Sequence, residues 1–280
     1  MSPEEREYLK GYSIAEFPRP SIAADVAVFS VLSDGEREDI RHLEKKELKV
    51  LLIRRANYPY RNCWSMPGGF CIPNEDVLDT ACRELREETN VSDAYLKLVG
   101  VYGEAGRDPR GWIISNTFMA LIDGSSVSLR AGTDAWEARF FRVALAREQH
   151  GDEVDYRLTL TDGDVTVSAL AREQRRTSGH RTEAHYHLLE SNGLAFDHGC
   201  ILIDALLRLR SDVENDLRPV FDLMPDCFTL TELQTAYELV SDKKALTANF
   251  RRKVAPYVRE TGVMTGGDGY RPAMLYERGQ

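Results

Sequence analysis

Three glutamates stand close together in the stretch RELREETNV, residues 83–91. Glu84, Glu87 and Glu88 have the i, i+3, i+4 spacing that places side chains on one face of an α-helix. Carboxylates on one face repel one another, and Mg²⁺ removes that repulsion because it prefers hard oxygen ligands, which it shares with phosphates and water. The spacing therefore indicates a magnesium site. A solvated acidic face is the alternative that the three residues alone leave open.

A longer pattern surrounds these glutamates. GFCIPNEDVLDTACRELREETNV, residues 69–91, resembles the Nudix box of Nudix hydrolases. The matching residues are Gly69, Glu75, Arg83, Glu84, Leu85, Glu87, Glu88 and Val91. Asn90 stands where the family has glycine, and asparagine is the best tolerated substitute in the left-handed conformation that ends many helices. We therefore expect the end of the helix to be kept.

The resemblance implies the fold and the chemistry of this region. The fold would be the α+β (α/β) Nudix fold, a mixed β-sheet between helices. Mg²⁺ or Mn²⁺ would be held by the three glutamates and by the main-chain carbonyl of Gly68, while Arg83 would pair with Glu75 and orient the helix. Metal ions would neutralise a diphosphate and activate water for its hydrolysis. Because Asn90 departs from the pattern, a site kept for sensing without turnover remains the alternative.

The segment after the box adds candidate ligand contacts. GRDPRGWIIS, residues 106–115, looks like the corresponding segment of ADP-ribose-recognising Nudix proteins. Arg107, Arg110 and Trp112 would contact phosphate, ribose or adenine through bidentate hydrogen bonds and stacking. An ordinary turn is the alternative. Glu104 and Glu137 are candidates for a general base, although a structural or surface role suits each of them better.

Apolar patterning predicts the elements that position these residues. Aliphatic and β-branched runs predict strands at 21–32, 48–55, 95–103, 112–122 and 135–143, and helical periodicity covers 75–89. Residues 157–170 read as a hairpin around Asp162-Gly163. The polar residues 171–193 lose the strand alternation and predict a helix crossing or a linker. We therefore expect a Nudix domain over 1–170, a linker over 171–193 and a second domain over 194–280.

The second domain has a mainly helical pattern. Thr229 and Glu232 form a capping-box sequence before one helix. A basic second helix follows, in which we expect four apolar side chains to be buried: Leu246, Phe250, Val254 and Tyr257. A glycine-rich hairpin over 262–276 completes the pattern of a winged helix-turn-helix. A small dimerisation or packing module is the alternative.

Three segments of this domain carry a second resemblance. LAFDHGCILIDALLRLR (194–210), FTLTELQTAYE (228–238) and NFRRKV (249–254) are similar to the C-terminal half of Nudix-related transcriptional regulators, typified by repressors of NAD metabolism. The resemblance implies a homodimer that binds a palindromic double-stranded operator and senses a nucleotide metabolite such as ADP-ribose. By position, the DNA contacts would be Asn249, Arg251, Arg252, Lys253 and, on the wing, Arg271.

We expect a ligand-responsive transcriptional regulator with a Nudix sensor domain. A working Mg²⁺-dependent, ADP-ribose pyrophosphatase-like hydrolase is an alternative that is compatible with regulation, and a protein-interaction module appended to an enzyme is a third. Regulators of sugar metabolism share this architecture, so nucleotide sugars and other phosphorylated metabolites remain candidate effectors.

The composition is typical of a soluble globular protein. The chain has 280 residues and a net charge of −9, which argues against a protein that coats nucleic acid uniformly. Residues 226–280 hold eight Lys and Arg against seven Asp and Glu, so the acidity belongs to the rest of the chain. Five scattered cysteines and the lack of membrane-length apolar runs predict a cytoplasmic protein with reduced thiols and no membrane association.

Overall fold

One large mixed sheet forms the centre of the molecule. The structure is a computed structural model that describes residues 1–33, 45–92, 94–126, 129, 135–265 and 272–279. The strands lie in the order β10-β9-β8-β7-β2-β1-β6-β5, with β3 paired to β2 and β4 to β1. Only the β1–β6 pair is parallel among these described strands. The bounds are β1 Ser21–Ser33, β2 Lys46–Arg55, β3 Trp64–Ser65, β4 Gly68–Phe70, β5 Leu96–Tyr102, β6 Ile113–Leu121, β7 Ala135–His150, β8 Glu153–Asp162, β9 Val165–Ser178 and β10 Arg181–Asn192.

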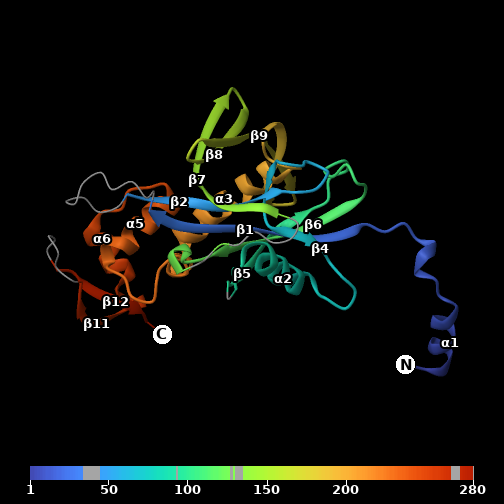
Figure 1. Cartoon of the computed structure of the whole chain (residues 1–280), viewed down its shortest axis with the longest axis horizontal. Helices are drawn as coiled ribbons and strands as arrows, with labels where there is room; N and C mark the ends of the chain where they lie inside the picture. Colours follow the sequence, from blue (N-terminus) through green and yellow to red (C-terminus); the bar gives the residue numbers. More distant parts are fainter. Residues whose placement is uncertain (34–44, 93, 127–128, 130–134, 266–271, 280) are drawn as a thin grey trace.

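Helices cover both faces of this sheet (Figure 1). Helix α2 (Val77–Thr89) packs on β1 and β4, and helix α3 (His198–Asn215) packs on β8, β9, β10 and β5. Successive side chains of a strand point to opposite faces. In β1, Val26 and Val28 therefore join the core under α2, while Ala27 and Phe29 join the core under α3. Burial on both faces explains why the sequence of β1 is a nearly continuous apolar run, and it confirms the expected mixed sheet between helices.

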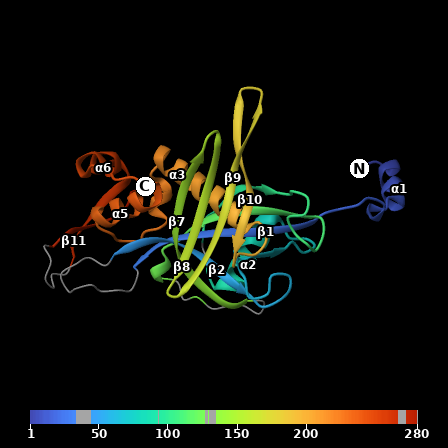
Figure 2. The same ribbon diagram turned by 90° about the horizontal axis from the view of Figure 1, so that it is seen from above.

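The expected helix over 171–193 is wrong, because most of these residues belong to β9 and β10. Their assignment as a linker between two domains stays a prediction. The two strands pair antiparallel, with Arg181 opposite Ser178 next to the turn. Figure 2 shows this hairpin in yellow, projecting from the body of the molecule. The outer half of the ribbon is largely exposed. A strand without a buried face has no reason to alternate apolar and polar residues, so its sequence lacks the usual strand pattern.

Helix α2 begins and ends at residues suited to these positions. The carboxylate of Asp76 accepts a hydrogen bond from the amide of Asp79 and caps the first turn. Asn90 closes the last turn with φ of 62°, in the left-handed region, and its amide donates to the carbonyl of Arg86. The expected left-handed end is therefore confirmed, and the residues before it keep a regular helical geometry.

The C-terminal region forms the predicted winged helix-turn-helix. Its elements are α4 Arg218–Phe221, α5 Leu230–Ser241, α6 Thr247–Val254, β11 Val258–Met264 and β12 Met274–Arg278. Thr229 and Glu232 make the expected capping box at the start of α5. Phe250 and Val254 are buried, but the expectation for Leu246 and Tyr257 is wrong. Leu246 precedes the first turn of α6 and Tyr257 follows the last, so both lie off its buried face.

The N-terminal segment lies apart from the rest of the molecule. Helix α1 (Pro3–Gly11) has no buried residue and projects from the end of the sheet opposite the winged domain (Figure 1). Short 3₁₀ turns occur at η1 Ile14–Glu16, η2 Gly124–Ser126 and η3 Ala255–Tyr257. Within the described residues, each helix is too short or too polar to span a bilayer.

Candidate ligand cavity and nucleic-acid interface

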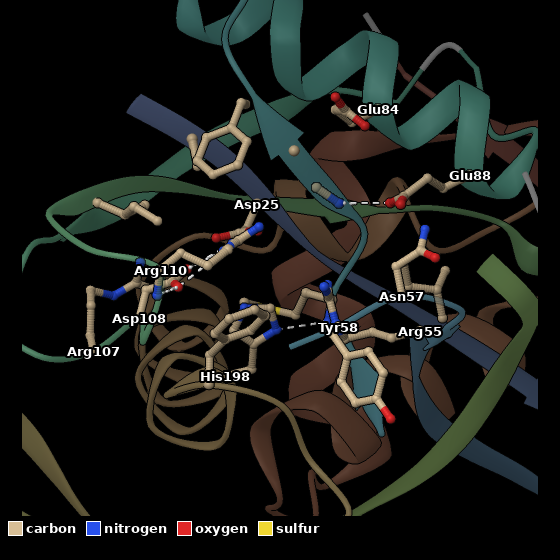
Figure 3. Close-up of a pocket in the computed structure, with 18 residues that line it drawn as sticks. Asp25, Arg55, Asn57, Tyr58, Glu84, Glu88, Arg107, Asp108, Arg110 and His198 are labelled. Carbon is tan, nitrogen blue, oxygen red and sulfur yellow. Dashed lines mark hydrogen bonds and ion pairs between the residues drawn. The ribbon is translucent and has the colours of Figure 1, made fainter. Parts of the chain in front are cut away.

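A cavity of about 320 Å³ opens beside helix α2 (Figure 3). Its walls come from β1, the end of β2, the β3–β4 segment, α2, the loop over 107–110 and the residues that start α3. Two carboxylates of α2, Glu84 and Glu88, reach it from one side, and three arginines reach it from β2 and the loop. Groups of both charges in one cavity suit a ligand that carries phosphates together with a cation.

Glu88 is the most buried member of the three predicted carboxylates. It is 8% exposed, and its Oε2 accepts a hydrogen bond of 2.8 Å from the amide of Gly68. Glu84 approaches the neighbouring strand so closely that a Cβ at Gly69 would overlap its carboxylate. Gly69 therefore has a packing reason, since β4 passes directly against the Glu84 carboxylate of α2.

The environment of these two carboxylates favours a bound cation. Burial raises the pKa of Glu88 to about 8, and the nearby charges of Glu84 and Asp25 add to the rise. Burial also raises the pKa of Glu84. A proton or a cation must offset the charge of such groups. Their carboxylate oxygens are the donors that Mg²⁺ prefers, so the residues present fit a magnesium ion.

Glu87 lies on the solvent side of the same helix. Its side chain is 57% exposed and contacts Arg83 at 3.4 Å. Among the described residues, no three His, Cys, Asp or Glu side chains converge as a metal-binding group. The structure therefore brings Glu84 and Glu88 to the cavity and leaves Glu87 outside, so the role of Glu87 in metal binding stays a prediction.

The predicted pair of Arg83 and Glu75 is confirmed. The Arg83 guanidinium donates two hydrogen bonds to the Glu75 carboxylate, from Nε at 2.8 Å and from Nη2 at 3.0 Å. These bonds lower the pKa of Glu75 to about 2. Arg83 also donates from Nη1 to Glu84 Oε1 at 2.6 Å. Arg83 therefore links the loop before α2 to a carboxylate that lines the cavity.

The two predicted arginines of the loop line the cavity, but each already has a carboxylate partner. Arg107 is almost buried and makes a bidentate pair with Asp197, at 2.8 and 2.6 Å. Arg110 makes a similar pair with the buried Asp108. Trp112 lies elsewhere, with 56% of its surface exposed, and does not line the cavity. Its ligand contact stays a prediction.

The candidate general bases also lie away from the cavity. Glu104 is 74% exposed and faces His187 at 3.9 Å. Glu137 pairs with Arg139 at 2.5 Å. Neither residue lines the cavity, so nothing in its geometry supports a general-base role for them.

The residues that line the cavity and that the sequence analysis missed include Asp25, Arg55, Phe196 and His198. Asp25 is buried in β1 and accepts a hydrogen bond from Ser115, and burial raises its pKa. A charged residue inside the apolar run of β1 was the available signal for it. His198 accepts a hydrogen bond from the amide of Met66 at 3.0 Å, and burial lowers its pKa to about 4, so it is neutral at pH 7. No spacing in the sequence links His198 to the box.

Four of the predicted DNA contacts are described and lie on helix α6 of the winged domain, and none of these four lines the cavity. Asn249, Arg251, Arg252 and Lys253 are all exposed on α6. Arg252 donates to the Asn249 side chain at 3.2 Å. Arg271 and the glycines at 266, 267 and 269 lie outside the described residues. Helix α6 thus presents exposed basic and amide side chains of the kind that contact bases and phosphates of DNA.

Comparison with known proteins decides the family. A model of the NUDIX domain matches residues 26–161, and a model of the NrtR DNA-binding winged helix domain matches residues 220–277. Over 279 residues the chain is 30% identical to the ADPR responsive transcriptional repressor NtrR of Acinetobacter baylyi, covering 97% of this chain and 87% of that protein. The chain belongs to the NrtR family. Strands β9 and β10 and helix α3 fall between the two matched ranges, so the domain boundaries at 170 and 193 stay predictions.

Two further relatives match this NrtR-family chain, one over most of its length and one over about a third of it. The crystal structure of Shewanella oneidensis NrtR complexed with a 27mer DNA is 26% identical, with a TM-score of 0.62, and the match covers 92% of this chain and 93% of that one. The ADP-ribose pyrophosphatase of Methanocaldococcus jannaschii is 43% identical over 97 residues, which are 35% of this chain and 56% of that protein. The chain is thus homologous to a transcriptional repressor over almost its whole length and to a hydrolase over 97 residues.

Proposed function

We propose that this chain is a transcriptional regulator whose Nudix cavity binds ADP-ribose and whose winged domain binds operator DNA. The observation that carries the proposal is the pairing of charges in one cavity. Four carboxylates line it, those of Asp25, Glu84, Glu88 and Asp108, together with the guanidinium groups of Arg55, Arg107 and Arg110. A nucleoside diphosphate sugar needs cationic groups for its phosphates, and a cation shared with carboxylates adds to them. The name of the Acinetobacter relative supports ADP-ribose as the ligand.

Mg²⁺ or Mn²⁺ would be held by Glu84 and Glu88, with Glu87 and the carbonyl of Gly68 as further candidates. When bound, the ion would neutralise charge on the diphosphate and lower the pKa of a water molecule. The chain itself fixes the carboxylates in place. The amide of Gly68 orients Glu88 and Arg83 orients Glu84, so little rearrangement is needed on binding.

Arginine and aromatic side chains of the cavity would bind the rest of the ligand. Arg107 and Arg110 present planar guanidinium groups that suit phosphate oxygens in a bidentate arrangement. Phe70 and Tyr58 line the same cavity and are exposed, Tyr58 by 80%, so their rings are candidates to stack on adenine. Trp112 would contribute only at the rim.

The DNA partner would be a palindromic operator bound by a homodimer. The exposed side chains of α6 support this proposal, with Asn249 and Arg252 as candidates for base contacts and Arg251 and Lys253 for the phosphate backbone. Two copies related by a twofold axis would place their α6 helices in successive major grooves. The cytoplasmic location stays a prediction.

Isothermal titration calorimetry with ADP-ribose tests the ligand directly. We expect saturable binding that needs Mg²⁺, with ADP-glucose, AMP and ribose 5-phosphate as comparison ligands. Binding of ADP-ribose that is no tighter than binding of AMP would contradict the proposal, because the diphosphate would then add nothing.

Hydrolysis of ADP-ribose is a second candidate function. It is favoured by Glu84 and the buried Glu88, which line the cavity, and by the similarity to an ADP-ribose pyrophosphatase. Release of AMP from ADP-ribose should be faster for the wild type than for Glu88→Gln. Equal low rates would rule hydrolysis out and leave a sensor that binds without turnover.

A further inference from the structure

The three residues Phe196, Asp197 and His198, which we call the junction, connect the cavity to the start of α3. The ring of Phe196 lies under two guanidinium groups, those of Arg55 at 4.9 Å and Arg110 at 5.2 Å. Its neighbour Asp197 holds Arg107 in the bidentate pair described above. These are the three arginines that line the cavity. Arg55 and Arg110 therefore contact Phe196, and Arg107 contacts its neighbour Asp197.

The backbone of the junction is held in an unusual conformation. Phe196 has φ of 53°, in the left-handed region that bulky residues rarely occupy. Such a conformation is strained and persists only where surrounding contacts impose it. Those contacts include the arginines above, the ring of Tyr60 at 4.8 Å and, through His198, the amide of Met66. A change in the arginine contacts would therefore change how strongly the left-handed conformation of Phe196 is favoured.

Helix α3 runs from the junction to the winged domain. Leu206, Leu209 and Val213 of α3 are buried in one core with Leu233 and Val240 of α5. Such close-packed contacts transmit a displacement instead of absorbing it.

Polar contacts also tie the last turns of α3 to the winged domain. Arg210 pairs with Asp242 at the end of α5, at 3.0 Å. The main-chain carbonyl of Glu214 accepts a hydrogen bond of 3.3 Å from Lys253 of α6. Lys253 is itself a candidate DNA contact, so the far end of α3 touches the helix proposed to enter the groove.

We propose that the junction and α3 transmit ligand binding to the DNA-binding helix α6. The proposal rests on the function proposed above. A diphosphate offers anionic oxygens that compete with Asp197 and with the Phe196 ring for the three guanidinium groups. When Arg107 turns to the ligand, Asp197 loses its partner and Phe196 is free to leave the left-handed region. The start of α3 then takes a second position, and its packing carries α5 and α6 with it. The ligand thus has different contacts in two states, which is what coupling between sites requires.

Asp197→Asn is the variant that tests this route. The measurement is the ratio of two dissociation constants of the full chain for a labelled duplex from upstream of its own gene, with and without saturating ADP-ribose and Mg²⁺, by fluorescence anisotropy. In the wild type we expect roughly the 5- to 150-fold change typical of allosteric coupling. In Asp197→Asn the ratio should fall at least fivefold toward one, while calorimetry still detects ADP-ribose binding.

Asp155→Asn is the matched control. Asp155 is buried and holds Arg172 in a bidentate pair at 2.8 and 3.0 Å, between β8 and β9 and away from the cavity. The substitution breaks the same kind of ion pair without touching the junction. We expect the wild-type ratio for this variant, and a loss of coupling as large as that of Asp197→Asn would overturn the proposal.

Phe196→Leu provides the second test, and it decides alone if Asp197→Asn does not fold by circular dichroism. This variant keeps the ion pair and removes the aromatic face under Arg55 and Arg110, and we again expect a ratio closer to one. A wild-type ratio in either folded variant with bound ligand would overturn the proposal. So would a loss of ADP-ribose binding in Asp197→Asn, because Asp197 would then act only on the ligand. If the wild type itself binds no ADP-ribose, or shows a ratio of one, the proposed function fails, and the wild type alone reveals it.

Discussion

The ligand cavity and the surface of α6 use charge in opposite ways. In the cavity most charged groups are buried or half-buried and already engaged, as Arg107 is with Asp197 and Glu88 is with Gly68. On α6 the charged side chains are exposed, and the hydrogen-bond partners of Arg252 and Lys253 are a side-chain amide and a main-chain carbonyl instead of carboxylates. Burial makes each charge costly and its removal consequential, whereas exposed charges are screened and contribute little to stability. The cavity should therefore respond to pH and to single-atom changes, and α6 to salt.

The largest effect is expected for Glu88→Gln. The amide oxygen can still accept the hydrogen bond of Gly68, so the fold is kept while the negative charge is lost. We expect Mg²⁺-dependent ADP-ribose binding to weaken at least about 100-fold, because changes to residues one step removed from a metal already cost about 10- to 100-fold. Calorimetry measures this directly. Glu87→Gln on the exposed side of α2 is the matched control, and an equal loss there would place Glu87 among the ligands.

The pH dependence of Mg²⁺ binding is expected to be nearly as large. The pKa of Glu88 is raised to about 8 from an ordinary value of 4.5, so below pH 8 a cation must displace a proton. Affinity should rise about tenfold per pH unit from pH 6 and level off above pH 8. Without Mg²⁺, the bound proton stabilises the folded state fully below about pH 4.5, and this contribution is lost as the pH rises to 8. A flat affinity between pH 6 and 8 would contradict the buried carboxylate.

Gly69→Ala should have an intermediate effect. A Cβ at this position would overlap the Glu84 carboxylate, so β4 or the side chain of Glu84 must move. We expect about 1–3 kcal/mol of lost stability together with weaker Mg²⁺ binding. Thermal unfolding with and without Mg²⁺ separates the two. The control is Gly11→Ala in α1, where the added methyl group meets nothing within 4 Å; equal behaviour of the two variants would show that the cavity tolerates displacement.

The smallest effect on the fold is expected for Arg251→Ala and Arg252→Ala on α6. Their free energies of unfolding should change by less than about 0.5 kcal/mol, as for other exposed positions. DNA affinity should fall, and each lost phosphate contact should reduce the slope of log affinity against log salt by about one. Filter binding at several salt concentrations gives that slope. An unchanged slope and affinity in both variants would remove α6 from the DNA interface.

The sequence predicted the parts of the molecule whose residues act through local spacing. Glu84 and Glu88, the Arg83–Glu75 pair and the left-handed Asn90 all lie within one continuous segment, and the structure brings the two glutamates to the cavity, makes the pair and ends the helix as expected. Glu87 of the same segment lies outside the cavity. The strand β1 was found because a sheet covered on both faces needs an apolar run. These features follow from periodicity within a few turns or residues.

The rest depends on contacts between distant segments. Asp197 meets Arg107 across 90 residues, and His198 meets Met66 across 132. No local pattern announces such pairs, and Arg107 was therefore expected to be available to a ligand when it is already paired. The prediction for residues 171–193 failed for another reason, since the β9–β10 ribbon is exposed to solvent and therefore carries no apolar alternation. Trp112 was expected to contact the ligand, but its side chain is exposed and lies outside the cavity.

The most direct test of the central claim is DNA binding by the wild-type chain with and without ADP-ribose. Fluorescence anisotropy at fixed salt, with Mg²⁺ in both samples, compares the dissociation constants for a duplex from upstream of its own gene. We expect ADP-ribose to change that constant at least about fivefold, saturating at the ligand concentration that saturates calorimetry. An identical dissociation constant with and without bound ADP-ribose would contradict a regulator controlled through its Nudix cavity.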